Sequence, residues 1–295
     1  MDSTFNERRN TWMLTYNDFC INRKSAPGLD LIDFINMVAD LNIKYIELRN
    51  DITGEVDNST ILDGYQPEEI KQLLDEKNIQ VVDINAQGNM DLVESLEENL
   101  KSLNEMIDIG KVLHVKNILF CPVRDANDKR TSAECRQGAI NNMKAYSKLL
   151  KENGMSGLLE PLGFMDSSLR TPWLAQDIIK AAKVDNFKLV ADNFHYYLAE
   201  VTKEDFETKV DPKMVGLVHL SSVVNQKPRE ELGDADRILV TKNDIMNALN
   251  HVKMFEESTY NGLYSFEPFS PDLYKWDAEK AKKEIVRSID LINAQ

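Results

Sequence analysis

The chain has 295 residues, of which 42% are hydrophobic and 28% charged, the composition of a globular protein rather than of a disordered or fibrous one. Aspartate and glutamate outnumber lysine and arginine by 49 to 35, which gives a formal net charge of -14. Because nucleic-acid binding draws most of its affinity from basic groups that displace counterions, this charge argues against a nucleic-acid partner.

Short apolar runs recur along the chain, and each is followed by a polar loop and a longer stretch with helical spacing. This rhythm predicts parallel strands joined by crossover helices. In chain order the eight predicted strands are 19–22, 45–49, 81–85, 117–121, 157–161, 188–192, 215–220 and 263–268. Eight such strands close into a (β/α)₈ barrel, an α/β fold that accommodates a chain of this length as one domain.

The segments between the strands show the spacing and the start signals of helices. Apolar stripes are formed by Leu31, Phe34, Ile35 and Val38 in one segment and by Met106, Ile109 and Val112 in another. Helix starts are indicated by Gln66 before Pro67, by Thr171 before Pro172, and by a capping box of Thr241 with Asp244.

No linker or low-complexity tract interrupts this pattern. We therefore expect a single barrel domain over residues 11–295, preceded by a loose polar arm over residues 1–10. The polar segment 223–239 lies between the seventh strand and its helix, and we expect it to form a loop over the site.

Four of the later strands end in residues that can bind a metal ion: Glu160, Asp192, His219 and Glu267. The carboxyl ends of barrel strands converge on one face, so these side chains are expected to meet there. Any one of them alone is more simply a helix cap or half of an ion pair. Burying three carboxylates together, however, is costly unless a cation compensates them. The set suits one divalent ion, and Mn²⁺, Mg²⁺ and Zn²⁺ all remain open.

Three further residues are candidates for binding a substrate. His195 lies three residues beyond Asp192, where the chain should leave the strand near the barrel mouth, and the competing interpretation is a loop histidine that packs on Tyr196 and Tyr197. Arg237 belongs to the polar loop, where a solvated charge cluster is the competing interpretation. Glu47 ends the second strand, where an ion-pair network with Arg49 is the simpler account.

Other features narrow the class of protein. Glycine-rich phosphate loops and the nucleophile elbow of esterases do not occur in the sequence. The three cysteines, Cys20, Cys121 and Cys135, are odd in number and lack metal-binding spacing, which indicates free thiols in a reducing compartment. With no signal-peptide pattern and no apolar run of about eighteen residues, we expect a cytoplasmic protein.

Several segments together resemble a known family. The most specific are 160–164 (Glu-Pro-Leu-Gly-Phe) and 266–269 (Phe-Glu-Pro-Phe), supported by 47–51 (Glu-Leu-Arg-Asn-Asp) and 192–195 (Asp-Asn-Phe-His). They are similar to the sugar isomerases and epimerases of the xylose isomerase-like TIM barrels, and among these to the inosose isomerases. The DNA-repair endonucleases of the same barrel depend on a histidine-rich cluster, which a chain with four histidines does not favour.

The resemblance implies a site and a reaction. Glu160, Asp192, His219 and Glu267 would bind the metal, Glu160 and Glu267 would be the catalytic residues that handle protons, and His195 would contact the substrate. The implied enzyme is an intramolecular oxidoreductase of inositol catabolism that converts 2-keto-myo-inositol into 1-keto-D-chiro-inositol through an enediolate.

The alternatives are an inosose dehydratase, a ketose 3-epimerase, and a sugar-binding barrel without catalytic activity. The expected partner is a small polyhydroxy ketone, with neither nucleic acid nor membrane, and a homo-oligomer is compatible with this reading.

Overall fold

The computed structural model describes residues 13–294 and shows a closed barrel of parallel strands in sequence order, with β8 pairing back to β1. The strands are β1 (Phe19–Asn22), β2 (Tyr45–Arg49), β3 (Gln80–Gln87), β4 (Asn117–Phe120), β5 (Ser156–Leu159), β6 (Phe187–Asp192), β7 (Val215–Leu220) and β8 (Leu263–Phe266). The predicted (β/α)₈ barrel is thus confirmed, with strand ends within two residues of their expected places. The arm expected at residues 1–10 lies outside the described residues.

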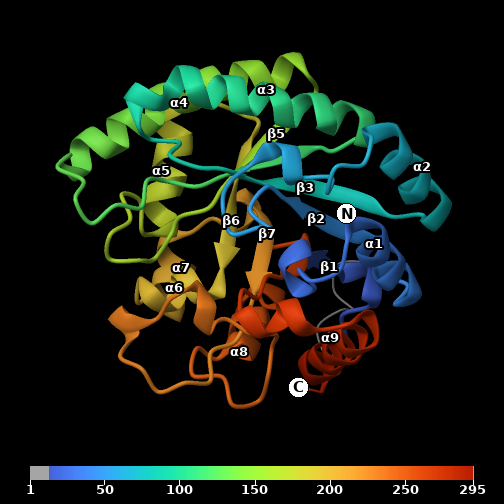
Figure 1. Ribbon diagram of the computed structural model, residues 1–295. Helices are drawn as coiled ribbons and strands as arrows, with labels where there is room; N and C mark the ends of the chain where they lie inside the picture. Colours follow the sequence, from blue (N-terminus) through green and yellow to red (C-terminus); the bar gives the residue numbers. More distant parts are fainter. Residues whose placement is uncertain (1–12, 295) are drawn as a thin grey trace, which may run out of the picture.

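Helices surround this barrel (Figure 1). They are α1 (Leu31–Asp40), α2 (Pro67–Lys77), α3 (Leu96–Leu113), α4 (Ser132–Glu152), α5 (Pro172–Ala182), α6 (Asn193–Leu198), α7 (Lys203–Lys209), α8 (Ala248–Glu256) and α9 (Ala278–Asn293). Helices α1 to α5 pack on one another in sequence order, and α9 packs against α1. In the part of the chain that the structure describes, no helix is both long and apolar enough to cross a bilayer.

The helix signals were confirmed in part. The predicted stripe of α1 is buried, and Gln66 and Thr171 are the N-cap residues of α2 and α5. In α3 the predicted stripe is displaced, because Ile109 and Val112 lie at its edges and are only partly buried. The face that packs on the barrel is formed by Leu103, Met106, Ile107, Gly110 and Leu113.

The capping box expected at Thr241 was wrong, because α8 begins only at Ala248. The carboxylate of Asp244 instead accepts hydrogen bonds from the backbone N–H groups of Val223, Met246 and Ala248. Asp244 therefore joins the loop after β7 to the start of α8.

The barrel interior is layered. An apolar cluster inside the barrel is formed by Leu119, Leu158, Val190 and Leu217. Side chains two positions apart on a strand point to the same face. Two positions beyond Leu158, Val190 and Leu217 stand three of the predicted metal ligands. These are Glu160, Asp192 and His219. An apolar layer thus fills the barrel beneath a charged layer at its C-terminal mouth.

Candidate metal centre

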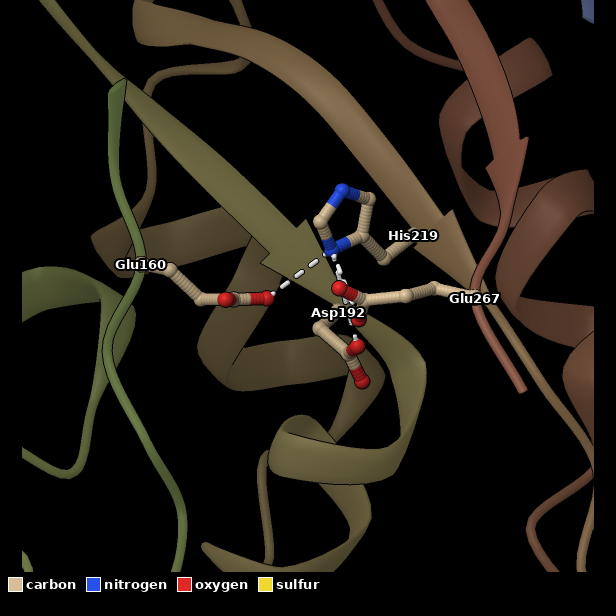
Figure 2. Close-up of side chains that lie close together, drawn as sticks. All are labelled: Glu160, Asp192, His219 and Glu267. Atoms are coloured by element: carbon tan, nitrogen blue, oxygen red, sulfur yellow. Dashed lines mark hydrogen bonds and ion pairs between the residues drawn. The ribbon is translucent and has the colours of Figure 1, made fainter. Parts of the chain in front are cut away.

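The four predicted ligands meet at the barrel mouth (Figure 2). Asp192 is the last residue of β6 and His219 lies within β7. Glu160 and Glu267 come directly after β5 and β8, and their backbone N–H groups still form hydrogen bonds with the neighbouring strands. The Glu160 N–H donates to the carbonyl oxygen of Phe120 at 3.0 Å, and the Glu267 N–H donates to that of Leu220 at 2.9 Å. One potential ligand atom from each side chain lies within 4.8 Å of all the others.

The imidazole of His219 lies at the centre of the cluster. Its Nδ1 atom is 3.0 Å from Glu160 Oε1, 3.0 Å from Glu267 Oε2 and 3.8 Å from Asp192 Oδ2. All four side chains are buried, none more than 4% exposed. The convergence expected from the strand order is therefore present as geometry.

Asp192 combines the two interpretations that its sequence position allowed. Its Oδ1 atom accepts hydrogen bonds from the N–H groups of Phe194 at 2.6 Å and His195 at 3.1 Å, which caps helix α6. Its Oδ2 atom faces His219. One carboxylate thus starts a helix and also contributes to the cluster.

The buried charges around the cluster fit a divalent cation. Four carboxylates and two guanidiniums surround it, those of Glu47, Glu160, Asp192, Glu267, Arg49 and Arg237. Burial and the carboxylate of Glu47 raise the pKa of Asp83 well above its usual value, which favours the neutral form of this additional carboxyl. Burial opposes a charge on His219, but Glu267, Glu47 and Glu160 outweigh it and raise the pKa of the imidazole well above its usual value, so without an ion the imidazolium offsets part of this charge. When the imidazole is neutral, as a metal ligand must be, two negative charges remain uncompensated. Because unpaired buried charge is costly, a cation of charge two is the group that this arrangement fits.

The electrostatics of the cluster lead to the same conclusion. Burial raises the pKa of Asp192 to about 6 in spite of Arg237, and burial together with Glu267 raises the pKa of Glu160. Burial also opposes ionisation of Glu267, but His219 and Arg237 outweigh it and lower the pKa of this carboxyl well below its usual value. A bound cation would favour the ionised form of all three carboxylates and the neutral form of the imidazole.

Two guanidiniums fix Glu267. Arg237 Nη2 donates to Glu267 Oε2 at 2.9 Å and to Asp192 Oδ2 at 2.5 Å. Arg49 Nη1 donates to Glu267 Oε1 at 2.5 Å. Both guanidiniums stack on the ring of Phe269, at 4.6 and 4.8 Å from its centroid. Both oxygens of Glu267 are thus occupied by charged donors, and the side chain has one position.

A cavity of about 240 Å³ lies at this mouth. Glu160, Glu267, His195 and Arg237 all line it, as expected for residues that contact a substrate. The loop 223–239 contributes both Asp234 and Arg237 to the wall, so its predicted place over the site is confirmed. The aromatic wall is formed by Phe164 and Phe269.

His195 points into this cavity as a neutral base. Burial lowers the pKa of its imidazole to about 4. The ring packs edge-on against Phe164 and at a tilt against Phe194 rather than against the tyrosines that follow it. Its Nδ1 atom has no hydrogen-bond partner among residues 13–294. The side chain is therefore rigidly placed and has a free polar atom.

Glycine is required in the segment Glu-Pro-Leu-Gly-Phe for a steric reason. A Cβ atom on Gly163 would lie 2.2 Å from the backbone oxygen of His195. The loop after β5 can therefore approach α6 this closely only with glycine at position 163, and this approach brings Phe164 against His195.

Glu47 does not occupy the position expected of a residue that contacts the substrate. Its side chain is fully buried, does not line the cavity, and reaches the Nε2 atom of His219 at 3.1 Å. Nor does it pair with Arg49, which binds Asp51 and Glu267 instead. Glu47 thus lies behind the cluster rather than in front of it.

Sequence reasoning missed two amides that also bind Glu267. Asn85 Nδ2 donates to its Oε1 atom at 3.1 Å, and Asn22 Nδ2 donates to the same atom at 3.4 Å. Both asparagines end predicted strands, so they carry the same positional signal as the ligands. The strand-end position was the signal that could have identified them, because it applies to amide side chains as well as to ionisable ones.

Comparisons with known proteins agree with the fold. A model of the xylose isomerase-like TIM barrel family matches residues 35–294. The inosose isomerase of Halalkalibacterium halodurans is 26% identical over 187 residues, which cover 63% of this chain and 65% of that protein. The inosose isomerase of Bacillus subtilis is 25% identical over 185 residues, which cover 62% of this chain and 65% of that protein. The chain thus spans about 65% of the length of the curated relatives it matches.

Solved structures extend the similarity to nearly the whole chain. A xylose isomerase domain containing protein from Salmonella typhimurium is 31% identical, with a TM-score of 0.87, over 95% of this chain and 99% of that one. The IolI protein, whose crystal structure contains a zinc atom, is 20% identical with a TM-score of 0.83, over 94% of this chain and 98% of that one. At that identity the second likeness shows the fold alone. From the family match and the first of these structures, the chain belongs to the xylose isomerase-like TIM barrel family.

Proposed function

We propose that this protein is a divalent-metal-dependent isomerase of a small polyhydroxy ketone, with an inosose as its substrate. The observation that carries the proposal is the cluster of Glu160, Asp192, His219 and Glu267, whose ligand atoms lie within 4.8 Å of one another at a cavity lined by both glutamates. The names of the inosose isomerases that the chain resembles support the choice of substrate. The reaction we propose is the conversion of 2-keto-myo-inositol into 1-keto-D-chiro-inositol.

The two glutamates are suited to different tasks. When bound, a divalent cation supplies Lewis acidity that stabilises negative charge on substrate oxygens. Glu160 Oε1 faces His219, whereas its Oε2 atom has only the weak thiol donor of Cys121, at 3.8 Å, among the described residues. Glu160 therefore keeps lone pairs available to take a proton from a substrate carbon and return it to the adjacent carbon. Glu267, held by charged donors, stays in place and accepts a hydrogen bond from a substrate hydroxyl.

The remaining cavity residues orient the ring. Arg237 presents a guanidinium at the wall, and neutral His195 offers an imidazole nitrogen to a hydroxyl group. The rings of Phe164 and Phe269 offer apolar surface for the carbon-bound hydrogens of a cyclic polyol. The free thiols of Cys20, Cys121 and Cys135 are consistent with the cytoplasm, which we propose as the compartment.

Incubation with 2-keto-myo-inositol in deuterated water, followed by NMR, tests this function. The expected product is 1-keto-D-chiro-inositol, with deuterium at the carbon that receives the proton wherever protonated Glu160 exchanges with solvent before it returns the proton. Treatment with a chelator should stop product formation. Loss of water would instead identify a dehydratase, and inversion at one carbon without ketone migration an epimerase. Binding of the ketone with neither a new product nor exchange of any carbon-bound hydrogen would identify a non-catalytic barrel and overturn the proposal.

A further inference from the structure

A second layer of polar side chains lies behind the metal cluster. Glu47 on β2 and Ser265 on β8 are both fully buried, and the Ser265 hydroxyl donates a hydrogen bond to Glu47 Oε1. Glu47 Oε2 is 3.1 Å from His219 Nε2. In Figure 2 this ring nitrogen points away from the three carboxylates, on the side opposite Nδ1. The imidazole is thus held from both sides.

These contacts decide which nitrogen of His219 can bind an ion. A neutral imidazole carries one proton, and the nitrogen without it has the lone pair that a metal requires. A carboxylate can only accept a hydrogen bond, and carboxylates lie on both sides of this ring. Once a cation is bound by Glu160, Asp192 and Glu267, Glu47 is the acceptor that remains, and it selects the form with the proton on Nε2. The lone pair is then on Nδ1, which is the atom that faces Glu160, Asp192 and Glu267.

The surroundings of Glu47 keep it in this role. Asp83 stands opposite it in the pairing of β2 with β3, and both of its carboxyl oxygens lack hydrogen-bond partners within residues 13–294. A neutral carboxyl at this position leaves Glu47 as the charge that faces the imidazole. Among the described residues, no lysine or arginine forms a salt bridge with Glu47, and its contact on this side is the imidazole of His219.

We propose that Glu47 is a positioning residue of the metal centre, which fixes the tautomer and the orientation of His219 so that Nδ1 binds the ion. This inference rests on the proposed function, because it presumes a cation at the cluster. A carboxylate bound to the second nitrogen of a metal-binding histidine typically contributes about 10- to 100-fold to metal affinity. Its substitution should therefore weaken metal binding without removing any ligand.

The test is the affinity for Zn²⁺ and for Mn²⁺, measured by competition with a chromophoric chelator. Glu47→Gln keeps the size of the side chain and one acceptor oxygen, and it should weaken binding by about 10-fold or more. Glu47→Leu removes both acceptors and should weaken binding further, whereas Ser265→Ala should have a smaller effect. The matched control is Glu256→Gln. Glu256 lies on the outer helix α8, and its carboxylate accepts a hydrogen bond from the hydroxyl of Tyr264. This variant should bind zinc as the wild type does.

NMR of histidine labelled with ¹⁵N provides a second measurement, because the chain has only four histidines. In the zinc-loaded wild type, His219 should carry its proton on Nε2, and in Glu47→Leu this proton should lose its protection from exchange. Circular dichroism identifies any variant that has failed to fold, and Ser265→Ala then replaces it in the comparison.

The outcomes separate this inference from the proposed function. If Asp192→Asn loses the ion while Glu47→Gln retains wild-type affinity and the wild-type tautomer, the positioning role is overturned and the metal centre stands. If Asp192→Asn also binds the ion as the wild type does, the metal centre itself is wrong and the inference is overturned with it. Weaker binding in both variants, with no change in Glu256→Gln, supports both.

Discussion

Arg237 offers the sharpest test of how charge is balanced in this barrel. Its guanidinium is 1% exposed and contacts Asp192 at 2.5 Å, Glu267 at 2.9 Å and the hydroxyl of Ser221 at 3.2 Å. Arg237→Met keeps much of the volume and the packing on Phe269 but removes the charge. Asp192 would then lose its arginine partner, and Glu267 would retain only Arg49 of its two guanidiniums.

The expected loss follows from this geometry. Removing one partner of a buried ion pair costs about 3–5 kcal/mol, because the other charge stays buried and uncompensated. With an unfolding entropy of about 2.1 cal/mol/K per residue, that loss lowers the melting temperature of a chain of this size by roughly 5–8 °C. A metal ion at the cluster would compensate the same carboxylates, so the loss should be smaller in its presence.

Equilibrium urea unfolding, with chelator and then with zinc, measures both effects. Arg237→Lys retains a charge and should recover part of the stability. Arg229→Met, in the same loop, removes a half-exposed guanidinium paired with the exposed Glu200 and should cost less than about 1 kcal/mol. If Arg237→Met unfolds at the same urea concentration as the wild type in chelator, the charge balance described above is incorrect.

Three further predictions address the reaction, the loop and the acid stability. Glu267→Gln should lower turnover by about 10²–10⁴-fold while the circular dichroism spectrum is unchanged, and near-normal turnover would refute its role. Gly163→Ala should push the loop away from the His195 carbonyl, raise KM and cost about 1–3 kcal/mol in a urea titration, whereas an unchanged KM would show that the loop adapts.

The prediction for acid stability concerns His251. Burial lowers its pKa from 6.5 to about 3, so below pH 6.5 the unfolded chain binds a proton that the folded chain does not. The stability present above pH 6.5 is therefore lost as the pH falls toward 3, and His251→Phe should flatten this part of the profile by up to about 1.4 kcal/mol per pH unit. If the stability of the wild type and that of His251→Phe depend on pH in the same way, His251 does not contribute to the loss of stability in acid.

The strands and the meeting of the four ligands could be predicted because both follow from local rules. Parallel strands buried on both faces appear as short apolar runs, and the carboxyl ends of all strands lie at one mouth. The position of a ligand relative to the end of its own strand is therefore enough to place it. The start of α8 could not be predicted in this way, because Asp244 caps the helix from within an irregular loop whose path depends on Val223, far back in the chain.

The role of Glu47 shows what such rules leave out. Alternation puts Glu47 and Arg49 on the same inner face of β2. The two residues are nevertheless separated by about 6.6 Å along the strand, so they lie at different depths in the barrel. Arg49 reaches the cavity and Glu47 does not. Which residues of other strands share the depth of Glu47 depends on the stagger of the closed barrel, and no single strand carries that information.

The stagger also explains why a charged layer is tolerated in a place that barrels usually fill with branched apolar side chains. It sets Glu47 level with the far nitrogen of His219, while Glu160, Asp192 and Glu267 surround the near one. The two arginines offset two of the four carboxylate charges in this layer, and the remaining two negative charges are left for a divalent ion. Any ligand that binds only the folded chain stabilises it, so occupation of this centre must also raise the free energy of unfolding. Stability and metal binding are therefore coupled through the same buried layer, and a substitution that affects one should affect the other.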